Sequence, residues 1–365
     1  MLDGTATVVV KVGSSLLIDR DGQARTGWMA TLAGSLSRRA GPVIVVSSGA
    51  IALGRAAIGL GCRPASLAAA QAAAAIGQIR LAQIWTEAFA RYRRDAAQIL
   101  LTLGDLEDRA RYLNARNTLE TLLAHAVVPI INENDTVATG EIRFGDNDRL
   151  AARVAQLAGA ELLVLLSDVD GLYEANPATH PDARLVTTVE EVSAKIEALA
   201  DGTTATEFGT GGMPSKLAAA RTATAAGCQV LLTSGRGDCD PLTRYLDTGR
   251  GTVFSAAQRP LVRRKQWLRS LQQHAGRLLI DAGAASALRR GASLLPAGVQ
   301  TIEGQFERGA LLRIAGPDGD IGQGLSGYDA HEASCLAGAQ SSDIPARLGY
   351  AGRGPMIHRD DLVLF

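Results

Sequence analysis

The chain lacks several features that mark metal-binding, secreted or nucleic-acid-coating proteins. Its cysteines, Cys62, Cys228, Cys239 and Cys335, are scattered, with no C-x-x-C pair. This pattern argues against a structural zinc site and against a disulfide framework, and favours reduced thiols in a cytoplasmic protein. Lys plus Arg and Asp plus Glu balance at 37 each, so the chain has no global positive field of the kind that drives non-specific nucleic-acid binding.

Long apolar runs are also missing. No stretch approaches the ~20 apolar residues that span a bilayer, and the amino terminus lacks the basic and apolar regions of a secretory signal. We therefore expect no membrane segment. None of the five histidines has metal-ligand or triad spacing, and no G-x-S-x-G motif is present, so hydrolase and metalloenzyme functions receive little support.

The first two thirds of the chain have the pattern of an α/β domain. Short β-branched runs alternate with alanine- and leucine-rich segments, which is typical of βαβ units around a mostly parallel sheet. The expected strands are 6–11, 43–47, 98–102, 127–131, 162–166 and 229–233, and the expected helices are 29–39, 68–91, 109–125, 149–158 and 216–226. Continuous apolar runs such as 162–166 predict strands that are buried on both faces.

The composition changes after residue 252. A basic segment around Pro260 resembles a linker, and short strands at 278–280, 299–303, 311–314 and 362–364 are separated by glycine-rich turns. Such spacing predicts a small β-barrel. We therefore expect a first domain at 1–258, a linker at 259–272 and a second domain at 273–365.

The run from Gly209 to Lys216, GTGGMPSK, reads as a phosphate-binding loop. Small residues let backbone N–H groups approach an anion, the helix that follows offers its positive end, and the lysine adds a full charge. It is not a Walker motif, because Ser215 precedes Lys216 and Leu217 follows it. A glycine-rich turn before a helix is also common punctuation, so the loop needs partners elsewhere.

Candidate partners follow several of the expected strands. Lys11 is followed by Gly13 and two serines, and the next strand ends in Ser47, Ser48 and Gly49. Ligands of parallel α/β sheets bind beyond the carboxyl ends of strands. At Lys11, a strand-to-helix turn with a solvated lysine explains the residues equally well. Ser47, Ser48 and Gly49 are also explained by an N-cap for the helix that follows, and that role is compatible with ligand binding.

Two more clusters combine amides and carboxylates. Asn132 and Asp135 follow one strand, and Asp146, Asn147 and Asp148 open the next helix. Turn and N-cap propensity alone would explain each cluster, but several of them at one sheet edge are harder to dismiss. A carboxylate such as that of Asp135 suits an ammonium group, and amides both donate and accept.

Ser167 and Asp168 end the fifth expected strand in the segment SDVDGLY. The glycine falls too early for a calcium loop, and no glutamate closes it. Two interpretations of Asp168 stay open: it contacts a nucleotide, or it caps a turn.

In this order the segments Lys11 to Ser15, Ser47 to Ala50, Ile131 to Asp135, Gly145 to Asp148 and Gly209 to Lys216 resemble the amino-acid kinase family. The carboxyl-terminal part, with Asp281-Ala-Gly-Ala, GASLLPAG at 291–298 and GQFERG at 304–309, is similar to a PUA domain. The resemblance covers nearly the whole chain. It implies an αβα sandwich with ATP over the strands' carboxyl ends, and phosphorylation of the side-chain carboxylate of L-glutamate.

The resemblance also implies roles for individual residues. Lys11 and Lys216 would hold the transferring phosphoryl group, and Asp148 would organise the two lysines. The positions that match glutamate binding, or lie beside it, are Ser48, Gly49, Asn132, Asp135, Asp146 and Asn147. The positions that match nucleotide binding are Lys11, Ser167, Asp168, Thr210, Gly211, Gly212, Met213, Pro214, Ser215 and Lys216. The family usually has a hydroxyl residue where this chain has Pro214, which removes one N–H donor.

The implied chemistry is coherent by itself. A glutamate side chain, with a reference pKa near ~4.3, is already ionised at neutral pH and needs no general base. Two anions must be brought together, so fixed positive groups and Mg²⁺ would stabilise the moving charge. By the same resemblance we expect feedback inhibition by proline, a homo-oligomer (dimer or tetramer) and hand-off of the product to glutamyl phosphate reductase.

Two alternatives stay open. In the first, the protein is a kinase whose acceptor is another carboxylate, such as N-acetylglutamate or aspartate. In the second, it is an RNA-binding or regulatory protein that acts through its PUA-like domain. The balanced charge and the aromatic content of 4% weigh against RNA binding.

Overall fold

The computed structural model describes residues 4–19, 22–60, 66–138, 146–177, 179–200, 212–257, 268, 273–350, 352 and 354–365, except the side chains of Arg109 and Asp146. The chain divides into two compact units, Met1–Glu107 with Ala115–Gln258 and Asp108–Asn114 with Arg259–Phe365. The expected linker, 259–272, lies outside the described residues except for Leu268. The boundaries expected from the sequence therefore stay a proposal, and each unit is described by itself.

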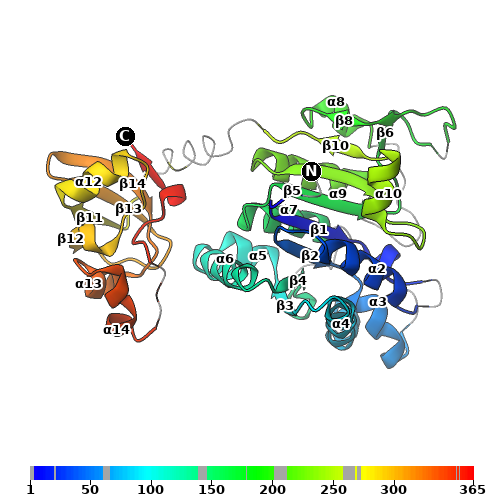
Figure 1. The fold of residues 1–365 in the computed structure, drawn as a ribbon, viewed down its shortest axis with the longest axis horizontal. Helices are drawn as coiled ribbons and strands as arrows, with labels where there is room; N and C mark the ends of the chain where they lie inside the picture. The colour runs from blue at the N-terminus through cyan, green and yellow to red at the C-terminus, as the bar shows by residue number, and fades with distance from the viewer. Residues whose placement is uncertain are drawn as a thin grey trace. The chain divides into compact units, whose positions relative to one another are not determined.

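The first unit is built on an eight-stranded sheet (Figure 1). The strands, in sheet order, are β3 (Ala96–Leu101), β4 (Val128–Glu133), β2 (Val43–Ser47), β1 (Val8–Val12), β5 (Leu162–Ser167), β9 (Gln229–Ser234), β10 (Thr252–Phe254) and β8 (Thr188–Val189). The strands β6 (Leu172–Tyr173) and β7 (Leu185–Val186) pair with each other in a separate two-stranded antiparallel sheet. The first six strands in this order pair in parallel, while β10 runs antiparallel to β9. The mostly parallel α/β fold expected from the sequence is confirmed.

Helices cover both faces of this sheet. The helices between Ser14 and Thr248 are α1 (Ser14–Leu17), α2 (Thr26–Ser37), α3 (Ala50–Gly54), α4 (Leu67–Ala90), α5 (Leu103–Glu107), α6 (Arg109–Ala124), α7 (Asp146–Leu157), α8 (Ala194–Ala198), α9 (Met213–Ala225) and α10 (Pro241–Thr248), with the 3₁₀ turns η1 (Arg55–Ile58) and η2 (Asp135–Val137). The start of α6, through Asn114, is grouped with the second unit. Val10 and Val12 pack with Leu32 of α2 and Trp85 of α4 in one buried cluster. Because side chains alternate along a strand, Lys11 projects to the other face, where α7 and α9 lie.

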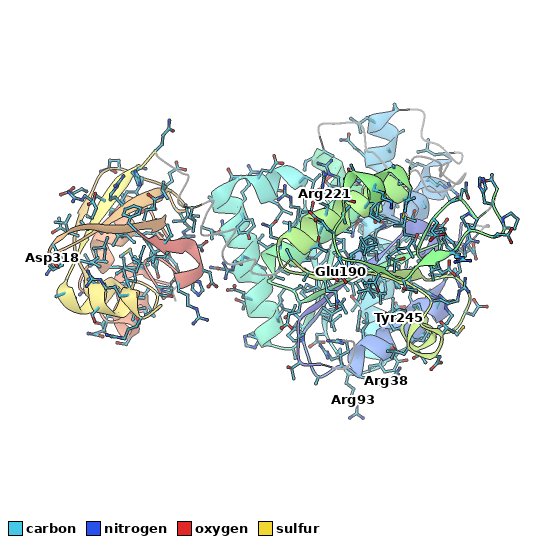
Figure 2. The ribbon with its side chains drawn as sticks, turned by 90° about the horizontal axis from the view of Figure 1, so that it is seen from above. Arg38, Arg93, Glu190, Arg221, Tyr245 and Asp318 are labelled. Carbon is cyan, nitrogen blue, oxygen red and sulfur yellow. The ribbon has the colours of Figure 1, made fainter. Side chains whose placement is uncertain are left out.

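The outer surface of this second layer is polar. Arg221 on α9 is exposed (Figure 2). Its guanidinium pairs with the Glu197 carboxylate of α8 at 2.9 Å. The inner surface of α9 is made of small residues, including Ala219 and Ala223, which are fully buried. These alanines let α9 pack closely against α7, and this packing sets the positions of the first turns of both helices.

Strand register aligns the functional segments. Val12 pairs with Ser47 on one side and with Leu166 on the other, and Ile131 pairs with Val46. The residues that follow these strands therefore leave the sheet at one edge. This edge is where ligands of parallel α/β sheets bind.

Two glycines bring α3 and α4 into unusually close contact. A Cβ atom at Gly77 would lie 1.7 Å from the Ala50 carbonyl oxygen, and one at Gly54 would lie 1.8 Å from the Ala73 carbonyl oxygen. Any larger residue would force the two backbones apart. Since α3 begins directly after Ser48 and Gly49, this crossing fixes the loop at the end of β2.

The second unit contains a five-stranded sheet in the order β12 (Val299–Glu303), β11 (Gly276–Ile280), β13 (Leu311–Gly316), β14 (Gly319–Leu325) and β15 (Leu362–Leu364). Its helices are α12 (Ala282–Arg289), α13 (Ala330–Leu336) and α14 (Ile344–Leu348), with 3₁₀ turns η3 (Pro296–Gly298), η4 (Ser341–Asp343) and η5 (Arg359–Asp361). Leu278, Leu312, Ile314, Tyr328 and Met356 lie in its core.

The sequence did not indicate β14, because glycine has a low strand propensity. The strand needs glycine because its neighbour lies so close. A Cβ atom at Gly322 would lie 2.4 Å from the Val363 carbonyl oxygen, and one at Gly324 would lie 2.8 Å from the Asp361 carbonyl oxygen. Within the described ranges, no helix combines the length and apolar character that crossing a membrane requires.

Candidate active site

Two lysines from distant parts of the chain share one buried carboxylate. Lys11 Nζ lies 2.6 Å from Asp148 Oδ1, and Lys216 Nζ lies 3.5 Å from Asp148 Oδ2. The Ser215 hydroxyl also donates to Asp148 Oδ2, at 2.7 Å. Asp148 is 1% exposed, and Lys11 and Lys216 are 7% and 8% exposed. The structure thus brings Lys11, Asp148, Ser215 and Lys216 together; we call these residues the lysine cluster.

Each member of the lysine cluster is held by regular structure. Lys11 belongs to β1, Asp148 lies in the first turn of α7, and Ser215 and Lys216 lie in the first turn of α9. A carboxylate in a first helical turn is favoured by the helix dipole. The parallel strand and the packed helices therefore fix the spacing of the two ammonium groups.

Burial and charge act in opposite directions on Asp148. Burial disfavours the carboxylate, but attraction to Lys11 and Lys216, with hydrogen bonds from Lys11 and Ser215, holds the pKa of Asp148 below its ordinary value. Burial, with repulsion from Lys11, lowers the pKa of Lys216, although attraction to Asp148 and Asp168 opposes that shift. The two ammonium groups and one carboxylate carry one net positive charge, which suits a polyanionic ligand.

A second group of polar side chains is uncharged. Asn147 Nδ2 donates to Ser48 Oγ at 2.7 Å and to Asn132 Oδ1 at 3.3 Å. Asn132 Nδ2 donates to Gln78 Oε1 at 2.7 Å. We call these four side chains the amide relay. It adjoins the lysine cluster through the peptide bond between Asn147 and Asp148.

The loop between β2 and α3 presents Ser48 to this relay. The Ser48 N–H donates to the Val12 carbonyl at 3.1 Å, and Gly49 has a φ of 106°, a conformation that favours glycine. The preceding residue, Ser47, is buried on the other face, where Trp85 Nε1 donates to its hydroxyl at 2.9 Å. Ser47 is therefore a structural residue, and Ser48 faces the relay.

A pocket of about 420 Å³ lies beside Asp168. Its lining includes Asp170, Tyr173, Pro177, Arg244 and Arg250. Asp170 accepts from the Tyr173 hydroxyl at 2.8 Å and from Arg250 Nε at 2.8 Å, which holds all three side chains in place.

Asp168 itself sits between the end of β5 and the β9–α10 loop. The Ser167 hydroxyl donates to Asp168 Oδ1 at 3.1 Å, and Arg236 Nη2 lies 3.6 Å from Asp168 Oδ2.

The other candidates are less fully described. Thr210 and Gly211 lie outside the described residues, as does the side chain of Asp146. Gly212 caps α9, and Met213 is buried. Pro214 occupies the first turn of α9, where proline disrupts no intrahelical hydrogen bond, although it leaves one N–H fewer for an anion. Asp135 begins η2, three residues after Asn132.

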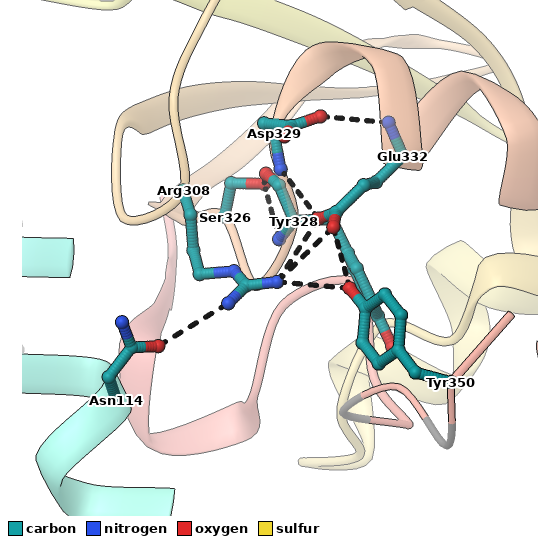
Figure 3. A network of polar contacts seen from close by, with 7 residues as sticks. All are labelled: Asn114, Arg308, Ser326, Tyr328, Asp329, Glu332 and Tyr350. Atoms are coloured by element: carbon teal, nitrogen blue, oxygen red, sulfur yellow. Dashed lines mark hydrogen bonds and ion pairs between the residues drawn. The ribbon is translucent and has the colours of Figure 1, made fainter. Parts of the chain in front are cut away.

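Another polar cluster, in the second unit, has a structural role. Arg308 Nη2 donates to Glu332 Oε2 at 3.1 Å and to the Tyr350 hydroxyl at 3.1 Å, and that hydroxyl donates to Glu332 Oε1 at 2.6 Å (Figure 3). Glu332 also completes a capping box with Asp329 at the start of α13. These contacts stabilise α13 and the segment around Tyr350.

Sequence reasoning missed Gln78, Tyr173 and Arg250. A signal for Gln78 was available, because Gln71 and Gln78 stand two turns apart in an alanine-rich helix and therefore share one face. Gln71 Nε2 donates to the Ala138 carbonyl at 3.1 Å, so both glutamines contact the segment that begins in β4. Tyr173 and Arg250 gave no comparable signal, because the contact between them joins positions 77 residues apart.

Two lysines at the carboxyl edge of a parallel sheet suit an enzyme that transfers a phosphoryl group, because such transfer relies on fixed positive charge. The sequence comparisons give the same class. Residues 6–234 match the amino acid kinase family, and residues 276–348 match the PUA domain. The chain belongs to the amino-acid kinase family.

Its relatives are more specific. The chain is 52% identical to a glutamate 5-kinase of Bradyrhizobium sp. (strain BTAi1 / ATCC BAA-1182), over 100% of this chain and 97% of that protein. It is 52% identical to a glutamate 5-kinase of Rhodopseudomonas palustris (strain ATCC BAA-98 / CGA009), over 98% of this chain and 96% of that protein. It is 51% identical to glutamate 5-kinase 1 of Rhizobium meliloti (strain 1021), over 100% of this chain and 93% of that protein.

A solved structure agrees on the fold of the first unit. The carbamate kinase from Giardia lamblia bound to AMP-PNP superposes with a TM-score of 0.51 at 18% identity, covering 70% of this chain and 100% of that chain.

Proposed function

We propose that the protein transfers the γ-phosphoryl group of ATP to the side-chain carboxylate of L-glutamate. The product is L-glutamyl 5-phosphate, and the reaction is the first step of proline biosynthesis. The observation that carries the proposal is the pair of buried lysines on Asp148, directly beside an uncharged relay that ends in Ser48 and Asn147. The names of the full-length relatives support glutamate as the acceptor.

The lysine cluster is the proposed site for the phosphates. Lys11 and Lys216 would contact the transferring group, and the first turn of α9 would direct N–H groups at it. The pocket of about 420 Å³ beside Asp168 has the volume of a small-molecule site and would take the nucleoside. Ser167 and Asp168 would lie between the two.

Magnesium would arrive with the nucleotide. Asp148 is engaged by Lys11, Ser215 and Lys216, and the described side chains form no group of three or more His, Cys, Asp or Glu that could hold a metal ion. Bound to the phosphates, Mg²⁺ would supply additional positive charge for the transfer.

The amide relay is the proposed site for glutamate. Ser48 Oγ accepts a hydrogen bond from Asn147, so its own O–H is left to donate to a carboxylate. Asn147 Oδ1 is buried and accepts no hydrogen bond from the described residues, so it is suited to an ammonium group. Asp135, in the 3₁₀ turn η2 that follows β4, would balance the charge of that ammonium. Gly49, Asn132 and Asp146 would complete the surroundings.

The reaction needs no proton transfer. A carboxylate oxygen of glutamate attacks the γ-phosphorus, a new P–O bond forms, and the bond to the ADP oxygen breaks. Two anions must approach each other, and buried ammonium groups lower that barrier more than exposed ones do. Asp148 acts here by holding both lysines in place.

The test is hydroxamate formation. Purified protein with ATP, Mg²⁺, L-glutamate and hydroxylamine should give γ-glutamyl hydroxamate, while an enzyme-free control should not. A panel with N-acetylglutamate and aspartate distinguishes the alternative acceptors. The absence of product from glutamate would refute the proposal.

We extend the proposal to regulation and partners. Proline would inhibit by overlapping the glutamate site, the protein would form a dimer or tetramer, and the labile acyl phosphate would pass to glutamyl phosphate reductase. Proline that competes with glutamate in the hydroxamate assay would support the first point. RNA binding by the second unit is the alternative function, and salt-dependent binding to structured RNA without kinase activity would favour it.

A further inference from the structure

Gln78 is a polar side chain at the candidate site that is far in sequence from every other candidate residue. It lies on α4, half-buried, one residue after the glycine that contacts α3. Its side-chain oxygen accepts a hydrogen bond from Asn132 Nδ2 at 2.7 Å. Asn132 is only 2% exposed, so water offers this amide little alternative.

The orientation of the Asn132 amide is fixed by the backbone. The Glu133 N–H donates to Asn132 Oδ1 at 2.9 Å. A backbone N–H can only donate, so the atom that faces it must be the side-chain oxygen. Asn132 Nδ2 therefore points at Gln78 and needs an acceptor there.

The orientation of the Asn132 amide also determines the orientation of the Asn147 amide and of the Ser48 hydroxyl. Because the Asn132 oxygen is fixed, the group of Asn147 that faces it must be the NH₂, and the same NH₂ donates to Ser48 Oγ. The Asn147 oxygen is thereby turned away from both partners, and Ser48 keeps its O–H for another acceptor. The relay therefore presents one donor, the Ser48 O–H, and one acceptor, Asn147 Oδ1, in a set order.

We propose that Gln78 is a positioning residue that maintains the donor and acceptor order of the glutamate site, by accepting from the end of the Asn132 amide that the Glu133 N–H leaves facing it. It acts through Asn132 and Asn147, and it does not touch the substrate. The inference rests on the proposed function, in which Ser48 and Asn147 contact glutamate. Without an acceptor at position 78, the buried Asn132 Nδ2 would be left unsatisfied. This cost would oppose the orientation that the Glu133 N–H favours, and the order along the relay would be weakened.

Three substitutions of Gln78 separate this role from packing and from simple charge. Gln78→Met keeps the length of the side chain and removes the acceptor. Gln78→Glu keeps an oxygen acceptor, whereas Gln78→Lys presents only donors to Asn132 Nδ2. We expect KM for glutamate to rise about 10-fold in Gln78→Met and at least as much in Gln78→Lys, but by less than about 3-fold in Gln78→Glu.

Direct electrostatics would give the opposite order. Glutamate is an anion, so a negative charge at position 78 would weaken its binding and a positive charge would strengthen it. KM for ATP should stay within about 2-fold in all three variants, because the lysine cluster is separate from the relay. Gln83→Met, the same change at an exposed position of α4, is the matched control and should change neither constant.

A double-mutant cycle tests the route of action. If Gln78 acts through Asn147, Gln78→Met should add almost nothing to KM for glutamate in an Asn147→Ala background. Additive effects, or a Gln78→Lys variant with wild-type KM for glutamate, would overturn the inference. A wild-type enzyme that makes no hydroxamate from glutamate would refute the proposed function instead, and the same series would then be measured on the acceptor that the panel identifies.

Discussion

The lysine cluster and the amide relay lie side by side at one edge of the sheet, but they are built from opposite kinds of group. The lysine cluster consists of full charges around one carboxylate, with Lys11 Nζ at 2.6 Å from Asp148 Oδ1. The amide relay consists of neutral dipoles whose order is set by the Glu133 backbone N–H. Charge acts at a distance and on any anion, whereas an ordered donor and acceptor respond to one arrangement of groups.

The difference suggests a division of labour. In the proposed function the lysine cluster would stabilise the phosphoryl group as its charge moves during transfer, so its removal should lower kcat. The relay would distinguish one amino acid from another, so its removal should raise KM for the acceptor. The substitutions below test that division, from the largest expected free-energy change to the smallest.

Asp148→Asn should be the most damaging change. It leaves two buried ammonium groups without their shared carboxylate, and breaking a buried ion pair on one side costs roughly 3–5 kcal/mol of stability. The sign of the pH dependence follows from the lowered pKa of Asp148. Its contribution is complete above the ordinary value of 3.8 and is lost as the pH falls through the lower folded-state pKa. Urea unfolding should therefore show a large gap between wild type and variant at neutral pH, and a shrinking gap below that value.

The matched control for this change is Asp238→Asn. Asp238 pairs with Arg25 at 3.0 Å, but its side chain is fully exposed. The Asp238→Asn variant should have the same urea midpoint as the wild type, within experimental error, at every pH. An Asp148→Asn gap that stays constant through the acid range would mean that ionisation of Asp148 does not stabilise the fold.

Lys216→Met should separate activity from stability. Loss of a charge that acts in the transition state lowers kcat by roughly 10²-fold or more. The lowered pKa of Lys216 means that burying its charged form costs folding free energy. An apolar side chain of similar length should therefore not reduce the melting temperature. Lys195→Met, at an exposed position of α8, is the control for kcat. An unchanged kcat in Lys216→Met would remove this lysine from the mechanism.

Gly77→Ala tests the relay from its supporting helices. Its Cβ atom would lie 1.7 Å from the Ala50 carbonyl oxygen, so α3 and α4 must separate. Overpacking of this kind costs roughly 1–3 kcal/mol. Since α3 follows Ser48 and α4 carries Gln78, KM for glutamate should rise while KM for ATP stays nearly constant.

Gly27→Ala is the matched control for Gly77→Ala, because no atom beyond the adjacent residues and the local helix backbone lies within 4 Å of the Cβ position at this α2 residue. It should be neutral or slightly stabilising. Equal rises in both KM values for Gly77→Ala would show that the helix crossing supports the whole site and not the relay alone.

The sequence was sufficient for the parts of this site that depend on local pattern. Buried strands such as 162–166 and polar residues directly after strands predicted the sheet and the edge where Lys11, Asn132 and Ser167 lie. Parallel pairing then brings these positions together without further information, because all carboxyl ends meet at one edge.

The sequence was not sufficient for contacts that depend on how helices pack. Two contacts have no local sequence pattern: the close packing of α3 against α4 at Gly77, and the hydrogen bond from Asn132 to Gln78, 54 positions away. The order of the relay was also out of reach, because it depends on which face of Asn132 meets a backbone N–H. Sequence reasoning finds which groups are present at the edge, while packing decides which way each of them faces.

Ser48→Ala is the mildest of the expected changes and the most direct test of the division. It removes the hydroxyl that Asn147 donates to, together with the O–H proposed to bind a carboxylate of glutamate. A hydrogen bond to a charged group is worth about 1.5 kcal/mol or more, so KM for glutamate should rise roughly 10-fold. The lysine cluster is untouched, so kcat and KM for ATP should each change by less than about 2-fold. Ser193→Ala, at the exposed N-cap position of α8 where the serine side chain makes no capping hydrogen bond, is the control. A fall in kcat that matches the rise in KM would mean that Ser48 acts on the transition state as the lysines do, and that the two groups form one catalytic unit.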